Sequence, residues 1–376
     1  MRIIARMNVG GPAVQVSGLM RGFSTTEFDH RLYTGFCASD EADYLETVTT
    51  DVKAIRIEGF GRRVSLGGDI QAFSTLVREI RKFKPHVIHT HTAKAGFLGR
   101  IASIISFQPS IRVHTFHGHL LSGYFGSLKR LLVVIAEKIL AIFTDQLLAV
   151  GDKVRQDLLQ AGIGGKDNFG LMPPGLAIDA LPEKESSLKS LGLPSGRLQC
   201  AFIGRVTQIK RPDRFLDVVS EIKRRGVDLD FFIAGDGELL EACRKRISDY
   251  NLSVTILGWQ SDIEKVMSAA DIVVLTSDNE GTPLSLIQAG MASLPVVTTN
   301  VGSVPEVVLD GVTGLVTTLD VQEIADALEK LVFDKHLRHR LGDKAQEFTL
   351  ANFGVERLVH DHEELYKKLL ASRAKS

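Results

Sequence analysis

The sequence predicts an α/β protein of two domains, each built around a parallel β-sheet. Short apolar runs that are typical of buried strands alternate with segments of helical periodicity along most of the chain, and this alternation is typical of parallel α/β architecture. The chain has 376 residues, which is long enough for two domains with a hydrophobic core each. The predicted strands span residues 2–7, 86–89, 111–116, 146–150, 199–203, 229–234, 254–257, 272–276 and 295–298.

A stretch rich in proline and glycine marks the predicted boundary between the domains. It begins at Met172 and is followed by a charged segment that reaches Gly196. We therefore predict a first domain at residues 1–172 and a second domain at residues 173–350. From Val355 to Leu370, apolar side chains recur on one helical face, so residues 351–376 are predicted to form a closing helix that packs back toward the first domain.

The composition disfavours several classes of protein. The chain has 45 basic and 45 acidic residues, so no net charge favours binding to nucleic acid or to an anionic membrane. Cys37, Cys200 and Cys243 lack the paired spacing of a disulfide framework or a zinc ribbon, which favours a reducing cytoplasm. No apolar run approaches the roughly 18 residues of a membrane span, and the first residues are too charged for a signal peptide. We therefore predict a soluble protein of the cytoplasm.

The segment most informative about function follows the predicted strand at residues 272–276. Glu280 comes after the end of this strand, and Pro283 suits the first turn of the helix that follows. Gln288 then lies two turns into that helix. Ligands of parallel α/β sheets bind outside the carboxyl ends of the strands. The two polar side chains therefore suit a grip on a sugar nucleotide.

Two other loops after predicted strands suit phosphate groups. Gly10 and Gly11 follow the first strand and open a helix, whose N-terminal amides favour a phosphate or an acceptor. In the second half, Gly204 is followed by Arg205 and Lys210, which supply a forked donor and a point charge for a diphosphate. The alternative for Gly10 and Gly11 is a purely structural turn, and the alternative for Arg205 and Lys210 is a solvated basic loop.

Two common nucleotide-binding motifs are missing from the sequence. It contains no Gly-x-x-x-x-Gly-Lys-Ser/Thr, the P-loop pattern. Gly235 and Gly237 lack the third glycine of a dinucleotide-binding fingerprint. ATPase and dehydrogenase functions are therefore disfavoured.

Histidines are concentrated in two segments that are predicted to follow strands, so that some of them could point into a cleft between the domains. In extended chain, His89 and His91 lie on one face, and so do His117 and His119. Such pairs support a second hypothesis, that the protein is a zinc or iron hydrolase. No carboxylate lies between residues 82 and 129 to complete such a site, and core or capping histidines are the common alternative. We predict no metal site and single out His117. The two segments contain His86, His89, His91, His114, His117 and His119.

Together these motifs resemble those of the retaining glycosyltransferases of family 4, which have the GT-B fold, and the similarity spans nearly the whole chain. Glu280 and Gln288 match the two positions of the family's Glu-x7-Glu motif, while Gly204, Arg205 and Lys210 match its diphosphate grip. The segments at residues 89–96 and 114–119 resemble a bacterial subgroup that assembles surface polysaccharides or glycolipids. The resemblance implies two Rossmann-like domains whose parallel sheets face a central cleft.

The resemblance also implies roles for particular residues. Glu280 would bind the hydroxyls of the donor sugar, Arg205 and Lys210 would neutralise the departing diphosphate, and His117 would face the transferred sugar. Configuration would be retained by a front-face route that needs no metal or other cofactor. The subgroup suggests a uridine diphosphate (UDP) sugar as the donor substrate, with an N-acetylated hexosamine as one candidate. The implied nucleotide-sugar site comprises Gly10, Gly11, Gly204, Arg205, Lys210, Glu280, Gly281, Thr282, Pro283, Leu284 and Gln288.

One position departs from the family pattern. Gln288 stands where the family usually has a glutamate that is expected to bind the ribose hydroxyls. Exchanging a charged hydrogen bond for a neutral one would weaken donor binding by roughly tenfold, which an active enzyme tolerates. The departure leaves open a second hypothesis, a catalytically silent sugar-nucleotide-binding or scaffold protein in a polysaccharide assembly complex.

The acceptor, a glycan or a lipid-linked sugar, is predicted to bind the first domain. His91, Lys94 and His119 are the candidate contacts, and Arg100 is a further cation for an anionic group. Residues 127–143 combine basic and apolar side chains. This combination fits either a helix that flanks the sheet or a peripheral contact with the inner face of the cytoplasmic membrane.

Overall fold

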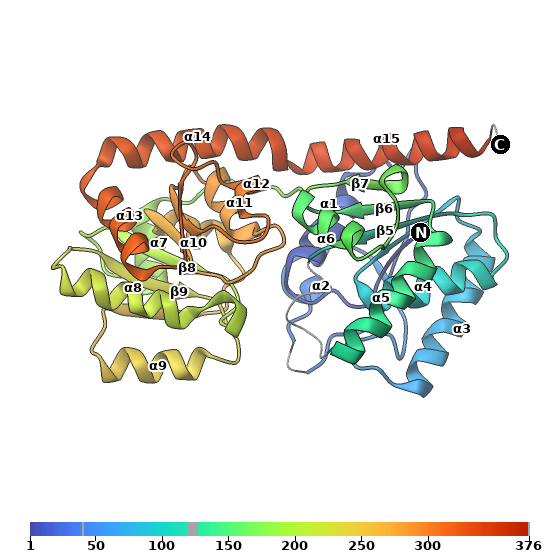
Figure 1. Ribbon diagram of the computed structural model, residues 1–376, viewed down its shortest axis with the longest axis horizontal. Helices are drawn as coiled ribbons and strands as arrows, with labels where there is room; N and C mark the ends of the chain where they lie inside the picture. The colour runs from blue at the N-terminus through green and yellow to red at the C-terminus, as the bar shows by residue number, and fades with distance from the viewer. Residues whose placement is uncertain (40, 119–126, 375–376) are drawn as a thin grey trace. The chain divides into compact units, whose positions relative to one another are not determined.

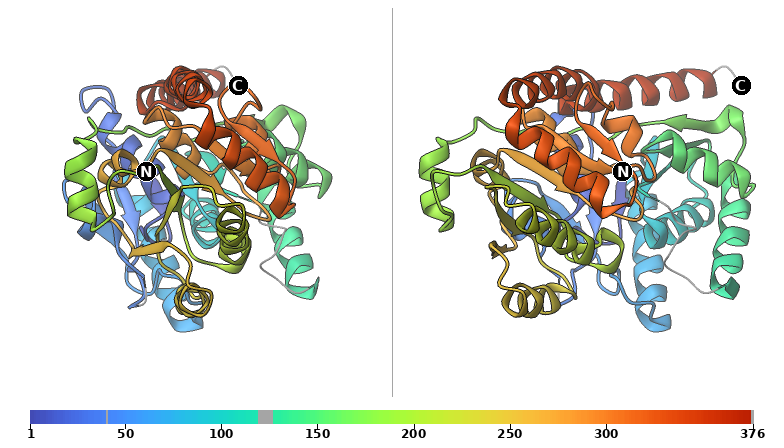
Figure 2. Two further views of the ribbon diagram at one scale, coloured as in Figure 1. Left: turned by 90° about the vertical axis from the view of Figure 1, so that its left-hand side faces the viewer. Right: turned by 60° about the vertical axis from the view of Figure 1, so that its left-hand side comes forward.

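The chain forms two compact units, each built on one parallel β-sheet. The computed structural model describes residues 1–39, 41–118 and 127–374. Unit 1 comprises residues 1–176 and 354–376, and unit 2 comprises residues 177–353 (Figure 1). Within each unit, helices cover both faces of the sheet (Figure 2). The prediction of two parallel α/β domains is therefore confirmed.

The sheet of unit 1 has seven strands in the order β3-β2-β1-β4-β5-β6-β7, and all neighbouring strands are parallel. The chain order reverses between β1 and β4, where ligands of such sheets commonly bind. The strands are β1 (Arg2–Ile4), β2 (Leu32–Thr34), β3 (Ala54–Arg56), β4 (Val87–His91), β5 (Ile111–Phe116), β6 (Gln146–Ala149) and β7 (Phe169–Leu171). The helices are α1 (Gly11–Gly22), α2 (Tyr44–Thr47), α3 (Leu66–Phe83), α4 (Ala93–Ile105), α5 (Ser127–Ile142), α6 (Asp152–Gln160) and α15 (Val355–Arg373), with a 3₁₀ turn η1 (Lys166–Asn168).

The sheet of unit 2 has six parallel strands in the order β10-β9-β8-β11-β12-β13, which places its reversal between β8 and β11. The strands are β8 (Gln199–Ile203), β9 (Asp230–Ala234), β10 (Val254–Gly258), β11 (Ile272–Leu275), β12 (Val296–Thr299) and β13 (Leu315–Thr317). The helices are α7 (Lys184–Leu191), α8 (Pro212–Arg224), α9 (Leu240–Asp249), α10 (Ile263–Ala269), α11 (Leu284–Met291), α12 (Val304–Val307), α13 (Val321–Phe333) and α14 (Lys335–Phe353), with a 3₁₀ turn η2 (Gln208–Lys210).

The two central strands of unit 2 are buried along their whole length. Helices lie on both of their faces, which is why these strands read as nearly continuous apolar runs in the sequence. Phe202 of β8 packs against Phe215 of α8, and Phe215 packs in turn against Phe231 of β9. This core fixes β8 and β11 side by side and thereby positions the loops that follow them.

The last helix of the chain belongs to unit 1. Leu358, Val359 and Tyr366 of α15 are buried in a cluster with residues of α1, β5 and β6. Gly22 of α1 allows this close approach, because a Cβ atom there would lie 2.3 Å from a methyl carbon of Val359. Residues from the end of the chain therefore reach the interior of the first sheet.

The structure corrects several predicted strand positions. Four strands of three residues each, β2, β3, β7 and β13, were not predicted, because three residues are too few to show an apolar pattern. The first strand ends at Ile4 rather than near residue 7. His89 and His114 lie within β4 and β5, as the predicted strand ranges 86–89 and 111–116 imply, and β4 continues to His91. The description of these three histidines as following the strands was therefore wrong. Among the described residues, no helix is both long and apolar enough to cross a membrane.

Candidate active site

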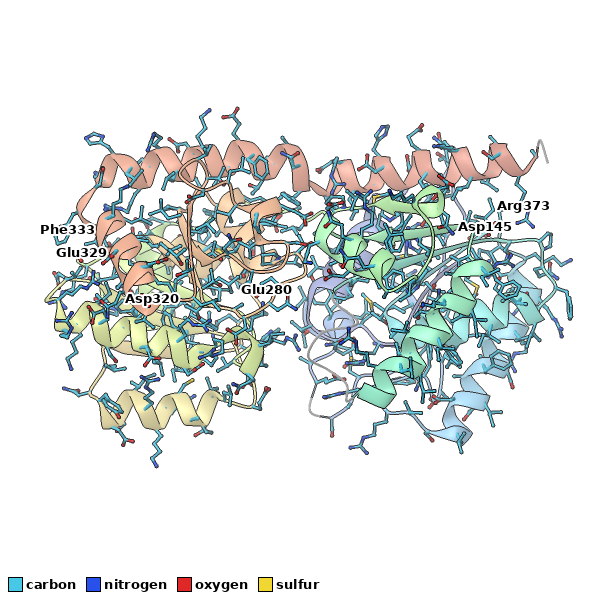
Figure 3. The ribbon with its side chains drawn as sticks, in the orientation of Figure 1. Asp145, Glu280, Asp320, Glu329, Phe333 and Arg373 are labelled. Carbon is cyan, nitrogen blue, oxygen red and sulfur yellow. The ribbon has the colours of Figure 1, made fainter. Side chains whose placement is uncertain are left out.

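The switch point of unit 2 brings two predicted loops to the same edge of the sheet. Strands β8 and β11 are neighbours, with Ala201 opposite Val273 and Phe202 opposite Val274. Because the strands are parallel, the loop that begins at Gly204 and the loop that contains Glu280 both leave from the carboxyl edge. Figure 3 labels Glu280 in this loop, which leads from β11 into α11.

Glu280 is held by a lysine and a serine. The Lys210 Nζ atom lies 2.5 Å from Oε1 of Glu280, and the Ser277 hydroxyl donates to the same oxygen at 2.5 Å. Glu280 is only 7% exposed, so burial of its charge is costly and these two charge-assisted bonds offset that cost. The structure thus brings together two residues that the sequence analysis assigned to one site. Ser277 was not predicted.

The loop that carries Lys210 is fixed by a second set of polar contacts. Arg214 donates to the backbone oxygen of Thr276 at 2.6 Å and to the carboxylate of Asp278 at 2.8 Å. Arg211 also donates to Asp278, at 3.0 Å, and the backbone amide of Asp278 donates to the oxygen of Ile209. Asp278 is therefore a positioning residue that the sequence analysis missed, because no local pattern shows that it contacts the loop around residue 210.

Gly302 allows the chain after β12 to pass directly over the Glu280 backbone. Its φ of 53° lies in the left-handed region, and a Cβ atom there would lie 1.9 Å from the backbone oxygen of Glu280. The next amide, that of Ser303, donates to this same oxygen at 3.1 Å. The position of Glu280 thus depends on a residue without a side chain at position 302.

We expect Gly302→Ala to disturb the Glu280 loop. The clash adds to the cost of alanine at positive φ, so the free energy of unfolding should fall by about 2–4 kcal/mol, and transfer activity should fall with it. Gly311→Ala is the matched control, because Gly311 also has positive φ but nothing lies within 4 Å of its added Cβ. Urea unfolding should show a loss of only about 1 kcal/mol for the control, with activity kept. Equal losses for both variants would contradict the proposed contact.

The structure places the other predicted donor-binding residues around the same edge of unit 2. Arg205 is exposed, and its guanidinium forms no hydrogen bond or ion pair with the described residues. Pro283 is the N-cap residue of α11, and Gln288 is half-buried two turns from Glu280 on that helix. The loop between Glu280 and α11 contributes the partly exposed Gly281 and Thr282, and Leu284 begins the helix.

The switch point of unit 1 lies between β1 and β4. Gly10 is the N-cap residue of α1, and Gly11 opens that helix, so its first amides lie at the carboxyl edge of β1 as predicted. In β4, His91 pairs with Ile4 of β1 and is followed by Thr92. Thr92 has a φ of 69°, which is rare for a β-branched residue. Strain of this kind is concentrated at functional sites, and here it lies at the edge where a ligand is expected.

His117, which follows β5, is paired with His91. Nδ1 of His91 and Nε2 of His117 are 3.0 Å apart, so one of these nitrogens donates and the other accepts. The tautomer of His91, that is, which of its ring nitrogens carries the hydrogen, therefore fixes the tautomer of His117. Nε2 of His91, which is fully buried, has no partner among the described residues.

A buried network extends from this pair to the last helix. The ring of His91 stacks on that of His89, with centroids 4.2 Å apart. His89 bonds through one nitrogen to the Tyr366 hydroxyl at 2.6 Å and through the other to Thr115 at 2.7 Å. His362 of α15 also stacks on His89 and donates from Nδ1 to the backbone oxygen of Leu358.

These histidines are held in the neutral form. Burial removes the solvation of the charged ring, and this lowers the pKa of both His117 and His362 to about 3. Burial and the nearby histidines also lower the pKa of His89 and His91 well below the ordinary value of 6.5. A neutral ring keeps one acceptor nitrogen and one donor N–H. His117 can therefore exchange either kind of hydrogen bond with a ligand near neutral pH.

In the structure, the two predicted acceptor cations, Lys94 and Arg100, each pair with a carboxylate. Lys94 lies 2.5 Å from Asp69 and also donates to a backbone oxygen. Arg100 is only 1% exposed and bonds to the buried carboxylate of Glu137 at 2.6 Å. The prediction that Arg100 is available to an anionic acceptor was therefore wrong. His119 lies outside the described residues.

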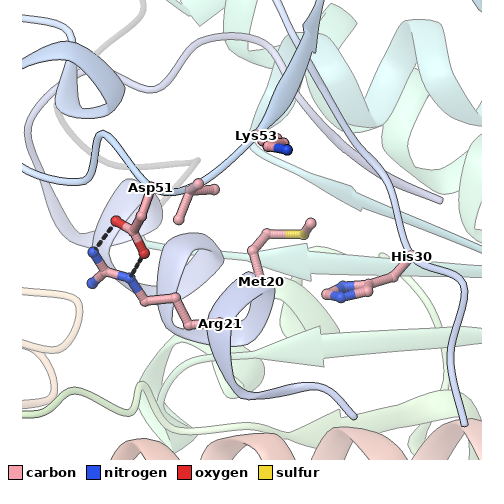
Figure 4. Close-up of a pocket in the computed structure, with 6 residues that line it drawn as sticks. Met20, Arg21, His30, Asp51 and Lys53 are labelled. Carbon is pink, nitrogen blue, oxygen red and sulfur yellow. Dashed lines mark hydrogen bonds and ion pairs between the residues drawn. The ribbon is translucent and has the colours of Figure 1, made fainter. Parts of the chain in front are cut away.

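No three histidine, cysteine, aspartate or glutamate side chains among the described residues are arranged to hold a metal ion. His89 of β4 and His114 of β5 bond instead to hydroxyls, and His91 of β4 bonds to His117. A surface pocket elsewhere in unit 1, of about 400 Å³, is lined by Met20, Arg21, His30, Asp51, Val52 and Lys53, and Arg21 pairs there with Asp51 (Figure 4). It contains none of the predicted site residues.

Comparison with known proteins identifies the class of enzyme. Residues 9–178 match the family described as Glycosyltransferase Family 4, and residues 183–348 match the family described as Glycosyl transferases group 1. A protein of Escherichia coli named UDP-Gal:alpha-D-GlcNAc-diphosphoundecaprenol alpha-1,3-galactosyltransferase is 27% identical, over 88% of this chain and 87% of its own length. The capsular polysaccharide biosynthesis glycosyltransferase CapM of Staphylococcus aureus is 23% identical, over 82% and 83%.

Solved structures agree with this result at the level of the fold. HepE of Anabaena, crystallised with UDP, superimposes with a TM-score of 0.81 over 98% of this chain and 99% of its own, at 20% identity. Two Rossmann-like units with the observed strand orders are thus those of a GT-B glycosyltransferase. The chain belongs to the family 4 glycosyltransferases, which are retaining hexosyltransferases that use nucleotide sugars.

Proposed function

We propose that this protein transfers a hexose or N-acetylated hexosamine from a UDP sugar to a glycan or lipid-linked acceptor during the synthesis of a cell-surface polysaccharide. The observation that supports this most directly is the Lys210–Glu280 pair at the switch point of unit 2. The choice of UDP follows the names of two similar proteins, the galactosyltransferase of E. coli and HepE with bound UDP. We place the reaction in the cytoplasm, where free cysteines such as Cys37 stay reduced.

In the proposed reaction, the bond between the anomeric carbon and the diphosphate oxygen breaks while the acceptor oxygen bonds to the same face of that carbon. The acceptor's proton passes to the leaving phosphate oxygen. Negative charge therefore grows on the diphosphate, and Lys210 together with Arg205 would stabilise it from the loop after β8. Lys210 is already oriented before the donor binds, so little reorganisation is needed.

Glu280 would orient the sugar rather than attack it. Its carboxylate is held by Lys210 and Ser277, and this arrangement suits an acceptor of hydrogen bonds from sugar hydroxyls. Gln288, two turns along α11, would bind the ribose through its amide. In unit 1, His117 would contact the transferred sugar in the tautomer that His91 selects. No metal ion enters any of these steps.

A donor screen tests the proposed function. Purified protein is mixed with uridine, guanosine and adenosine diphosphate sugars, and thermal stabilisation is followed together with release of the nucleoside diphosphate. We expect UDP sugars to stabilise the protein and to release UDP. A response to guanosine or adenosine donors alone would overturn the choice of nucleotide. Binding without release, even with acceptor present, would favour a silent sugar-nucleotide-binding protein.

The acceptor is tested in a second step with the donor found in the first. A polyisoprenyl-diphosphate-linked N-acetylglucosamine is compared with free N-acetylglucosamine, and the products are identified by mass spectrometry. We expect transfer to the lipid-linked sugar, which is the kind of acceptor that the name of the E. coli relative gives. Transfer only to the free sugar or to a soluble glycan would leave the donor assignment intact and reject the lipid-linked acceptor.

A further inference from the structure

Arg2 of β1 is a buried cation that no described carboxylate neutralises. It is only 4% exposed, and none of the described aspartates or glutamates forms an ion pair with it. Its guanidinium donates instead to the Tyr366 hydroxyl at 3.2 Å and to the sulfur of Met20 at 3.9 Å, and it lies 4.8 Å from the ring centre of Phe23. A buried charge without a counter-ion is costly, and it acts strongly on the polar groups around it, because the interior screens it poorly.

The polar groups around Arg2 are neutral histidines of the same unit. Arg2 is paired in register with His89 of β4, and the Tyr366 hydroxyl that accepts from Arg2 also bonds to His89 at 2.6 Å. The rings of His91 and His362 both stack on that of His89. Burial lowers the pKa of His91 and of His362, and the charge of Arg2 contributes to this shift in both.

The tautomer of His362 follows from its hydrogen bond. A carbonyl oxygen can only accept, so Nδ1 of His362, 2.8 Å from the backbone oxygen of Leu358, carries the ring hydrogen. Nε2 of His362 is then a bare acceptor, and it has no partner among the described residues. Buried N–H groups without a partner are rarer in proteins than buried acceptors with a free lone pair. The nearby charge of Arg2 also favours a lone pair over an N–H.

His91 is in the same situation as His362. Its Nδ1 faces Nε2 of His117 at 3.0 Å, so its Nε2 is directed away from His117. This Nε2 is fully buried and has no partner among the described residues. Both the cost of an unpaired N–H and the charge of Arg2 therefore disfavour a hydrogen on Nε2 of His91.

We infer that His91 carries its ring hydrogen on Nδ1, that His117 is thereby held as a hydrogen-bond donor, and that Arg2 is the positioning residue whose charge maintains this arrangement. Nδ1 of His91 then donates to Nε2 of His117, and the neutral ring of His117 has its N–H at Nδ1. His117 is partly exposed, so this N–H can meet a ligand. The ligand atom must be an acceptor, such as a sugar hydroxyl oxygen, and His117 is not available as a base. The inference rests on the proposed function only for the identity of this ligand.

The tautomers are tested without any sugar, by ¹⁵N NMR of the full chain labelled at its histidines. Long-range ¹⁵N–¹H correlations distinguish a ring nitrogen that carries hydrogen from a bare one, and His91→Gln and His117→Gln assign the signals. Near neutral pH we expect hydrogen on Nδ1 and a bare Nε2 in both rings. Hydrogen on Nε2 of either ring would overturn the inference. The result does not depend on whether the protein is a transferase, because no donor is present.

Two substitutions separate the charge of Arg2 from its shape. Arg2→Met keeps most of the side-chain length but removes a buried charge without a counter-ion, so it should fold at least as stably as the wild type. In this variant we expect the Nε2–H tautomer of His91 to become populated. The value of kcat should fall about two- to tenfold at unchanged KM, which corresponds to one neutral hydrogen bond. Arg2→Lys keeps the charge and should keep the wild-type tautomers and kcat.

The matched control is Arg78→Met on α3, which removes an arginine whose side chain is 72% exposed and should leave the tautomers and kcat at their wild-type values. Wild-type tautomers in Arg2→Met would reject Arg2 as the positioning residue. An equal shift of the tautomers in Arg2→Lys would do so too, because the shape of the side chain and not its charge would then matter. A shifted tautomer in Arg2→Met with unchanged kcat would support the inference and reject the proposed contact of His117 with the sugar.

Discussion

Replacing Lys210 by alanine is expected to lower kcat/KM for sugar transfer by about 100- to 1000-fold, which is the size of effect found when a preorganised group that stabilises developing charge is removed. Lys210 bonds to Glu280 at 2.5 Å, and its backbone is held by Thr276, so its charge is oriented before a donor binds. The effect should appear mainly in kcat, because the charge on the leaving diphosphate grows during bond cleavage. Release of UDP under initial-rate conditions measures it.

The Lys210 variant needs two comparisons. Lys245→Ala removes an exposed lysine of α9 in the same unit and should keep wild-type rates. His117→Ala should lower kcat while the affinity for UDP stays near the wild-type value, because His117 is proposed to contact the sugar and not the nucleotide. Wild-type rates for Lys210→Ala would reject the assigned role. A loss of UDP affinity in His117→Ala as large as the loss in kcat would reject the role of His117.

Stability must be separated from catalysis in this experiment. Without Lys210, the buried carboxylate of Glu280 keeps the Ser277 hydroxyl but loses its cation, which should cost about 3 kcal/mol of unfolding free energy. Adding Glu280→Gln to the Lys210 variant removes the buried charge that Lys210 had paired with and should restore most of this stability. Activity should stay low in the double variant. If activity returned together with stability, Lys210 would be a structural residue only.

The positions of the candidate donor residues in the fold were largely predictable, because these residues follow two buried strands. The apolar runs of β8 and β11 fixed where the loops begin, and the family resemblance then named Lys210 and Glu280. The structure adds what sequence spacing does not contain. Asp278 and Arg214 are 64 residues apart in the chain, and nothing in the local sequence of either indicates that they bond to each other.

The histidine network was the part of the first unit that the sequence could not reveal. His89 and Tyr366 are 277 residues apart, and their contact exists because α15 packs into unit 1. The same kind of distant contact explains the correction at Arg100. Its stretch of sequence lacks carboxylates, but Glu137 reaches it from α5. A stretch of sequence with basic residues and no acidic ones thus predicts a basic surface only where no residue from elsewhere in the chain neutralises the basic side chains.

Acid is expected to destabilise unit 1 well above the pH at which carboxylates titrate. Burial lowers the pKa of His89, His91, His114 and His362 in the folded chain, to about 3 for His362, whereas an unfolded histidine titrates near 6.5. Between these values the unfolded chain binds protons that the folded unit cannot, so stability falls as the pH falls below 6.5. For His362 alone the loss at pH 5 is about 2 kcal/mol.

The other buried histidines act in the same direction, and a domain has only about 5–15 kcal/mol of total stability. We therefore expect unit 1 to open before pH 5 while unit 2, which lacks such a network among its described residues, stays folded. Hydrogen exchange resolved by mass spectrometry measures this separately for the two units in a pH series. Peptides from β4 and β5 should lose protection between pH 6.5 and 5, and peptides from β8 and β11 should keep it.

A single substitution tests whether the histidines cause the acid sensitivity. His362→Gln removes a titrating ring, and its amide can still donate to the backbone oxygen of Leu358, so the fold at pH 7.5 should be kept. The loss of stability per pH unit should then decrease by up to about 1.4 kcal/mol, the contribution of one proton. His336→Gln, at an exposed position of α14 in unit 2, is the matched control and should leave the slope of unit 1 at the wild-type value. If both variants show the wild-type slope, the acid sensitivity of unit 1 has another origin.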